Sequence, residues 1–113
     1  MSWMMMGVSR APASAGFDPL TLFSGGAQGL WLDPSDSTKV WQDSGLSTPA
    51  GSGDPLGGIT DKSGNGNNVT QGTAGFRPTL TNSGGKWYFQ TDDSDDYLRG
   101  TFTINQPYYL FVA

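Results

Sequence analysis

The chain has 113 residues and a formal net charge of −4, and it contains no histidine and no cysteine. This length fits one small domain or part of a larger one. Without histidine and cysteine there is no His-based catalytic triad, no zinc site of the usual Cys/His kind and no disulfide framework. All ten acidic residues are aspartates, and an isoelectric point near 4.3 offers no basic surface to a nucleic acid. No run of about 18 apolar residues exists, so no segment is predicted to span a membrane.

The composition favours a folded β protein. Seventeen glycines and seven prolines leave no room for a long helix, while aromatic residues make up 12% of the chain. A low net charge together with this aromatic content argues against disorder. We therefore predict an ordered, loop-rich, all-β protein with an aromatic core.

Residues 1–16 differ in composition from the rest of the chain. Their apolar cluster consists of Trp3, Met4, Met5, Met6 and Val8. Methionine side chains are flexible and fill irregular surfaces, and a cluster of this size would be adhesive in water. We predict an N-terminal arm that docks on another subunit through these five side chains. The alternative is a frayed terminus, the default for any domain.

From residue 17 onward, short apolar runs alternate with turns rich in glycine, asparagine, aspartate, serine and proline. This is the pattern of antiparallel strands joined by tight connections. The first predicted strand lies where Leu30 and Leu32 alternate around Trp31.

One short helix and one long loop follow. Asp33 is a suitable N-cap and Pro34 suits the first helical position, so one or two helical turns are predicted over 35–41. The composition of residues 42–58 predicts a long surface loop.

Two further strands are predicted by alternation. Trp87 and Phe89 share one face of the first. The second runs over 97–105, and its apolar face is formed by Leu98, Gly100, Phe102 and Ile104. Two layers of such strands would bury one face of each, so we predict an antiparallel β-sandwich.

Residues 108–113 are apolar at every position, as expected of a strand in the middle of a covered sheet. No turn or partner strand follows them, and an open apolar edge would template aggregation. We therefore expect residues 1–113 to be the first part of a longer sandwich. The alternative is that a neighbouring chain completes the sheet.

Residues 61–67, with the sequence DKSGNGN, form the most distinctive motif. Their alternating oxygen-bearing side chains resemble the start of a calcium-binding loop, with Asp61, Ser63 and Asn65 as candidate ligands. The twelfth position, where such a loop has a bidentate glutamate, is Gly72. Aspartate, asparagine and glycine also form tight turns without any ion. We favour the structural role and keep a weak calcium site as the alternative; no other cofactor is predicted.

Residues 92–96 contain four aspartates. Glycoside hydrolysis needs two carboxyl groups on opposite sides of a sugar bond, whereas neighbours in one turn diverge. We predict a solvated acidic turn, with metal binding as the alternative.

Exposed aromatic rings stack well on sugars, and Trp41 and Tyr97 are candidates for this role, with core packing as the alternative. With three loop residues they form the predicted ligand-binding set: Trp41, Asp61, Asn65, Asn67 and Tyr97.

Four segments, taken in order, resemble a known family. They are GLWLDPSDSTKVWQDSG, GDPLGGITDKSGNGNNVTQ, RPTL and GGKWYFQTDDSDDYL. Together they resemble the concanavalin A-like, laminin-G-like domains in virion and tail proteins of tailed bacteriophages. In that wider group D-x-S-G-N-G-N and a later F-D-G-x-D-D-Y-[LV] recur in this order. The first motif is intact at 61–67; the second, at 89–98, departs at Gln90 and Thr91 and is longer. The resemblance covers residues 17–113.

The resemblance implies a jelly roll of two antiparallel sheets, usually near twice this length. The group includes carbohydrate-binding modules, adhesion domains and glucanases. The catalytic glutamates of the glucanases are absent, so no enzymatic activity is expected unless a further part of the protein supplies it. The expected function is a structural component of a phage virion, such as a tail, fibre or head-decoration protein. The arm would attach it to other virion proteins, and a homo-oligomer, as a trimer, is expected. The alternative is a carbohydrate-binding adhesin that recognises the host surface.

Overall fold

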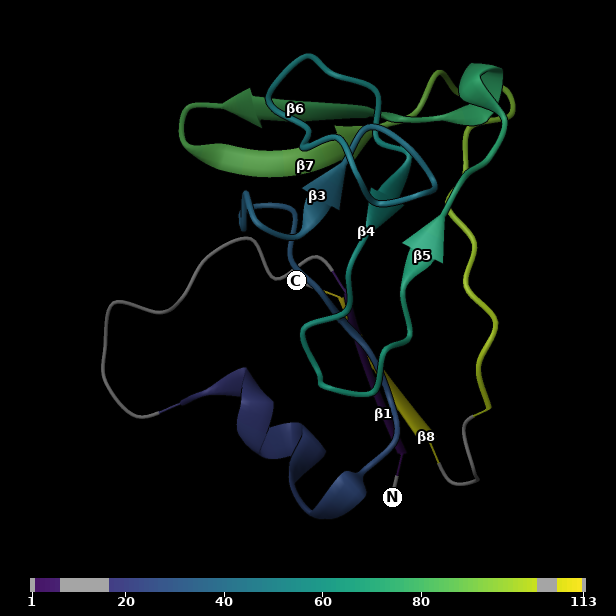
Figure 1. Ribbon diagram of the computed structural model, residues 1–113. Helices are drawn as coiled ribbons and strands as arrows, with labels where there is room; N and C mark the ends of the chain where they lie inside the picture. The colour runs from purple at the N-terminus through teal and green to yellow at the C-terminus, as the bar shows by residue number, and fades with distance from the viewer. Residues whose placement is uncertain (1, 7–16, 104–107, 113) are drawn as a thin grey trace.

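The computed structural model describes residues 2–6, 17–103 and 108–112 (Figure 1). Its elements are β1 (Ser2–Met6), η1 (Pro19–Gly26), β2 (Trp31–Leu32), β3 (Val40–Trp41), β4 (Gly58–Ile59), β5 (Val69–Thr70), η2 (Ala74–Phe76), β6 (Thr79–Ser83), β7 (Lys86–Gln90) and β8 (Tyr108–Val112). The described residues hold mostly strands and little helix, as expected of an all-β protein. Both helices in the described ranges are short 3-10 helices, and neither is long and apolar enough to cross a membrane.

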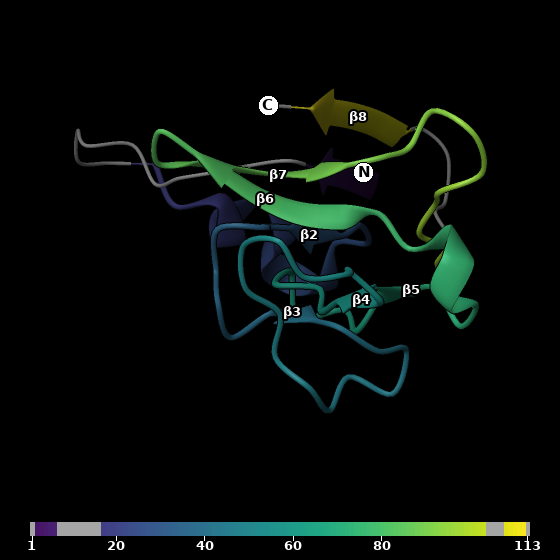
Figure 2. The same cartoon turned by 90° about the horizontal axis from the view of Figure 1, so that it is seen from above.

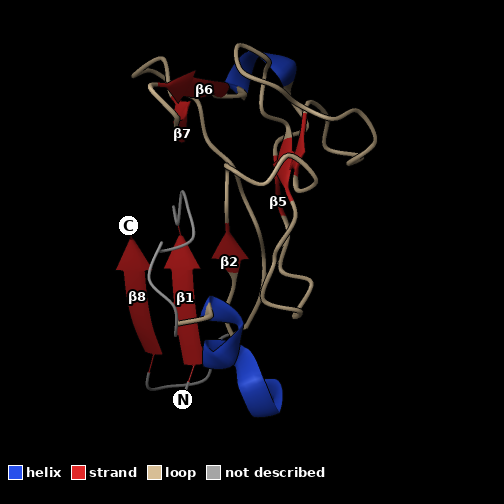
Figure 3. Ribbon diagram, turned by 90° about the vertical axis from the view of Figure 1, so that its left-hand side faces the viewer, coloured by secondary structure: helices blue, strands red, loops and turns tan. Residues whose placement is uncertain are grey.

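The two ends of the chain meet in one parallel sheet. β1 lies between β2 and β8, and all three strands run in the same direction (Figure 3). β1 pairs over its full length with β8, from Ser2 opposite Tyr108 to Met6 opposite Val112. A sandwich of antiparallel strands was predicted, so this sheet is a departure. Parallel strands need long connections, and the chain between β1 and β8 provides one.

The parallel sheet also bears on both predictions for the chain ends. Residues 2–6 of the predicted arm form a strand paired on both sides within this chain, while residues 7–16, Val8 among them, lie outside the described part. Docking of the arm on another subunit stays a prediction. β8 was expected in the middle of a sheet, but among the described residues it is an edge strand paired only with β1.

The other two sheets are antiparallel, as predicted. β3, β4 and β5 form one, with Ile59 of β4 between Val40 and Val69. β6 and β7 form a hairpin that Gly84 and Gly85 close at positive φ. Figure 2 shows the hairpin on one side and β3–β5 on the other, so these two antiparallel sheets form two layers.

The main core lies between these layers. It contains the buried side chains Leu30, Leu32, Val40, Ala50, Leu56, Ile59, Val69 and Leu80. Trp87, Phe89, Leu98 and Phe102 pack against it and stay half-buried. Trp31 belongs to a second cluster with Phe23 and Leu22, so both faces of β2 are covered. The alternation of Leu30 and Leu32 around Trp31 therefore separates two apolar clusters.

The predicted alternation of inward-facing and outward-facing side chains in β7 and over 97–103 is confirmed by their burial. In β7, Trp87 and Phe89 are half-buried and their neighbours are exposed. The same alternation runs over 97–103. A regular strand over 97–105 is wrong within the described residues, because only Arg99 forms a bridge, to Thr70. The neighbouring β5 is two residues long and cannot extend the ladder; residues 104 and 105 lie outside the described part.

The predicted helix over 35–41 is wrong. The Asp33 carboxylate does accept the backbone N–H of Ser35 at 3.0 Å, but two successive turns follow and the segment ends in β3. The first helix instead begins after Asp18, whose side chain accepts the N–H of Leu20 at 2.9 Å.

Residues 42–58 are largely irregular, as predicted, but they are not a surface loop throughout. Ala50, Leu56 and Gly57 are buried, and Leu56 is 0% exposed. The backbone N–H of Leu56 donates to the carbonyl of Pro78 at 2.7 Å, which ties the segment to the start of β6. Core packing therefore places Ala50 and residues 56–58 inside the protein.

Candidate functional site

Asp61 begins the loop between β4 and β5, and it is buried although it carries a carboxylate. Its Oδ1 accepts the backbone N–H of Trp31 at 2.7 Å and that of Ser63 at 2.8 Å. Its Oδ2 accepts the Ser63 hydroxyl at 2.6 Å and the backbone N–H of Asn67 at 3.0 Å. A buried charge is tolerated when hydrogen bonds replace its hydration, and four donors do so here.

The loop also binds the chain that leads into β2. The side-chain amide of Asn67 donates to the Gly29 carbonyl at 2.6 Å, and that of Asn65 donates to the same carbonyl at 3.1 Å. Asn65 reaches the Ala27 carbonyl as well, at 3.0 Å. The motif thus satisfies backbone groups just before and at the start of β2. We call Gly29, Asp61, Ser63, Asn65 and Asn67 the Asp61 knot.

The three candidate calcium ligands come together in this knot, but they are hydrogen-bonded to each other and to backbone. Ca²⁺ takes about six to eight oxygen ligands, and their lone pairs point at the ion. Both oxygens of Asp61 instead face N–H and O–H donors, and Ser63 donates its hydroxyl to one of them. The geometry favours the structural role of the motif, and calcium binding stays a prediction.

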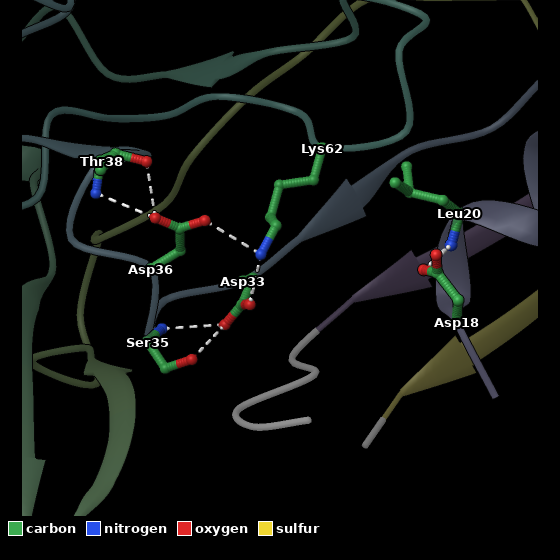
Figure 4. A network of polar contacts seen from close by, with 7 residues as sticks. All are labelled: Asp18, Leu20, Asp33, Ser35, Asp36, Thr38 and Lys62. Carbon is green, nitrogen blue, oxygen red and sulfur yellow. Dashed lines mark hydrogen bonds and ion pairs between the residues drawn. The ribbon is translucent and has the colours of Figure 1, made fainter. Parts of the chain in front are cut away.

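A second polar cluster lies beside the knot and was not predicted. The Lys62 ammonium lies 2.9 Å from a carboxylate oxygen of Asp33 and 3.0 Å from one of Asp36, as Figure 4 shows. The same ammonium lies 4.5 Å from the centroid of the Trp31 ring, a cation–π distance. These contacts bind the turn after β2 to the loop after β4.

The electrostatics of this cluster depend on partial burial and on hydrogen bonds. Partial burial alone would raise the pKa of Asp36, but hydrogen bonds from Thr38 and Lys62 outweigh it and lower this pKa to about 2. Partial burial alone would lower the pKa of Lys62, but the two carboxylates raise it above its usual value. Both partners of the Asp36–Lys62 ion pair are therefore charged at neutral pH.

We predict that Lys62→Met destabilises the protein by about 1 kcal/mol at neutral pH, since the pairs are partly exposed to solvent. Asp36 stabilises the fold above its unfolded pKa, near 3.8, and this contribution is lost as pH falls toward 2. The Lys62 contribution is present below pH 10.5 and is lost as pH rises through its raised folded pKa. Urea unfolding of wild type and variant across pH should show their difference shrinking below about pH 4. Lys86→Met, on an exposed side chain of β7, should show no such trend.

Trp31 carries one unsatisfied group. Its ring is 8% exposed, and its Nε1 has no hydrogen-bond partner among the described residues. An unpaired buried donor costs about 1–3 kcal/mol. The stacked Lys62 ammonium and the packing of Phe23 against the ring offset this cost.

The structure brings together three of the predicted ligand-binding residues, Asp61, Asn65 and Asn67, but not all five. Trp41 is half-buried, and its Nε1 donates to the Thr60 hydroxyl at 3.1 Å. Tyr97 is 49% exposed and pairs with Phe76 of η2, with ring centroids 6.1 Å apart. The loop between β4 and β5 extends away from η2 toward the other end of the molecule (Figures 1 and 3). The Asp61 knot and Tyr97 therefore cannot bind one small ligand together.

The acidic segment 92–96 forms the predicted turn. The Asp92 carboxylate accepts the N–H of Ser94 at 2.9 Å, and the Asp96 carboxylate accepts that of Asp92 at 3.0 Å. Oxygens of Asp92, Asp95 and Asp96 lie within 4.8 Å of one another, largely in solvent. Metal binding here stays a prediction.

The comparisons with known proteins add no relative. No protein-family model matches the chain, and no curated protein or solved structure matches it significantly. The resemblance to concanavalin A-like phage domains therefore stays a prediction that depends on the quoted segments.

Proposed function

We propose that the chain is a structural component of a bacteriophage particle, such as a tail, fibre or head-decoration protein. The observation that carries the proposal is the Asp61 knot. The D-x-S-G-N-G-N motif is central to the resemblance, and all four of its polar side chains engage in one set of hydrogen bonds at the entrance of β2. A motif used in this way maintains a fold, which fits a structural rather than a catalytic protein.

We further propose that the two layers are part of a concanavalin A-like sandwich. In support, the β6–β7 hairpin packs across β3–β5 through Leu80 and the half-buried Trp87 and Phe89. Further strands, from more of the same protein or from a neighbouring copy in a trimer, would cover these half-buried rings and the edge of β8 that has no partner among the described strands. No enzymatic activity is part of the proposal.

The anchoring of the protein to other virion components is tested by substitutions in the N-terminal segment. We expect Trp3→Ala combined with Val8→Ala to lower incorporation into particles about tenfold, as loss of an interface anchor does. The melting temperature of the isolated protein is measured alongside, because Trp3 lies in β1, which pairs with β2 and β8. The readout is quantitative mass spectrometry of purified particles.

Tyr88→Ala is the matched control, because Tyr88 is an exposed aromatic residue on β7, outside the N-terminal segment. Normal incorporation of the double variant would contradict anchoring by residues 1–16. Loss of incorporation together with a lowered melting temperature would assign these residues to the stability of the sheet alone.

A second candidate function is glycan binding, favoured by the exposed ring of Tyr97, which pairs with the half-buried ring of Phe76. Aromatic faces stack on sugar rings, and each such ring contributes strongly when it is exposed and held in place. We expect Tyr97→Ala to reduce binding on a glycan array about tenfold. Trp41→Ala, at a half-buried ring held by Thr60, should change stability more than binding. Equal glycan binding by wild type and the Tyr97 variant would rule out this site.

A further inference from the structure

We infer that the Asn65-Gly66 dipeptide is a deamidation site that the Asp61 knot protects, and that reaction there prevents the knot from re-forming. It is the one Asn-Gly sequence in the chain. Glycine offers no side chain to hinder attack by its own nitrogen, and Gly66 is exposed with φ +75°. Asn65 is half-buried within the knot.

The reaction needs only water. The backbone nitrogen of Gly66 gives up its proton and attacks Cγ of Asn65. The bond from Cγ to Nδ2 breaks, ammonia leaves with the proton, and a five-membered succinimide remains. Water then adds to one of its two carbonyl carbons and opens the ring to an aspartate or an isoaspartate at position 65.

The knot holds Asn65 away from this reaction. Its Nδ2 donates to the carbonyls of Ala27 at 3.0 Å and Gly29 at 3.1 Å and lies 3.2 Å from the Ser63 hydroxyl oxygen. Its backbone N–H donates to the same oxygen. Turning the side chain toward the Gly66 nitrogen breaks these bonds, so the reaction requires local opening. Because the reaction must wait for this opening, deamidation of the folded chain should be about tenfold or more slower than that of the unfolded chain.

The product does not fit the knot. A carboxylate at position 65 has no N–H for the carbonyls of Ala27 and Gly29, so acceptor would face acceptor. It would also place a second negative charge beside the Asp61 carboxylate, which shares Ser63 with position 65. An isoaspartate would in addition lengthen the backbone by one carbon. Deamidation therefore irreversibly removes the hydrogen bonds from position 65 to the chain that enters β2.

The rate is measured by peptide mapping of the full chain during incubation at neutral pH. Trypsin cuts after Lys62 and Lys86 but not at the Arg77–Pro78 bond, so it releases residues 63–86, in which Asn65 is distinguished by fragmentation. We expect the deamidation rate of Asn65 to be lower by about tenfold or more in folded protein than in urea. Ser63→Ala should remove most of this protection. Ser94→Ala, in the acidic turn, is the matched control and should leave the rate unchanged. Equal rates for the folded and unfolded chain would overturn the proposal, as would faster reaction at Asn67 or Asn68.

The irreversible loss of these hydrogen bonds is tested with Asn65→Asp. Its melting temperature should fall by about 4 °C or more. Asn82→Asp is the control, because the side-chain oxygen of Asn82 accepts the N–H of Gly85 and a carboxylate keeps this bond. If the variant does not fold, the deamidated fraction of aged wild type, isolated by anion exchange, gives the same comparison. A deamidated protein that melts like wild type would overturn this loss.

Discussion

Replacing Asp61 by asparagine is expected to destabilise the protein by about 3–4 kcal/mol, although the two side chains have nearly the same shape. The carboxylate accepts two donors on each oxygen. An amide keeps one oxygen and turns the other into an NH₂ group, which then faces two donors. In one orientation the N–H groups of Trp31 and Ser63 lose their acceptor, and in the other the Ser63 hydroxyl and the N–H of Asn67 do. Each unpaired buried donor costs about 1–3 kcal/mol.

Urea unfolding followed by tryptophan fluorescence measures this effect. Asp92→Asn is the matched control, because Asp92 also accepts two backbone N–H groups in a short turn, from Ser94 at 2.9 Å and Asp95 at 3.3 Å, but is exposed. Solvent replaces those bonds, so its cost should stay below about 1 kcal/mol. A similarly small cost for Asp61→Asn would contradict the structural role of the knot. A melting temperature that rises with calcium and falls with a chelator would favour the calcium alternative.

Local patterns of burial were predictable from the sequence, but the ladders that pair the strands were not. Period-two alternation depends only on neighbouring residues, and it correctly separated half-buried from exposed positions in β7 and over 97–103. A ladder also needs a partner of equal length, and β5 is too short to supply one beside Arg99. The parallel sheet depends on pairing between residues at opposite ends of the chain, for which no local signal exists.

Aspartate followed by proline shows why the helix was misplaced. This dipeptide occurs at 18–19, 33–34 and 54–55, and only the first begins a helix. After Pro19 the apolar sequence LTLF buries Phe23 against Trp31. After Pro34 the sequence is polar, and Asp36 accepts both the N–H and the hydroxyl of Thr38. Such local side-chain bonds compete with helix formation. Packing of the residues that follow the proline, rather than the capping aspartate, therefore decides whether a helix forms.

The candidate site was predictable only in part, for the same reason. The motif at 61–67 is contiguous, so its side chains could be recognised together. Their partners Ala27 and Gly29 lie more than 30 residues earlier, where only backbone carbonyls take part and the residue type gives no signal. The ion pair of Lys62 with Asp33 likewise joins residues 29 positions apart.

Gly57→Ala is expected to destabilise the protein by about 3 kcal/mol, because an added methyl group would overlap backbone atoms. A Cβ at Gly57 would meet the carbonyl oxygen of Gln42 and lie 2.7 Å from both the Cα and the nitrogen of Asp43. The backbone there cannot easily move away. The N–H of Gly57 donates to the Trp41 carbonyl at 2.8 Å, and the Gly57 carbonyl accepts the N–H of Gln71 at 2.8 Å.

Gly75→Ala is the matched control for this prediction. Gly75 lies in η2, and no atom lies within 4 Å of an added Cβ. Alanine restricts the unfolded chain more than glycine does, so this variant should equal wild type in stability or exceed it by up to about 1 kcal/mol. Urea unfolding of both variants measures the contrast. If Gly57→Ala were as stable as Gly75→Ala, the backbone at 42–43 would be free to move, and residues 42–58 would behave as the surface loop that their composition predicts. A loss near 3 kcal/mol would instead show that Gly57 is clamped between β3 and Gln71.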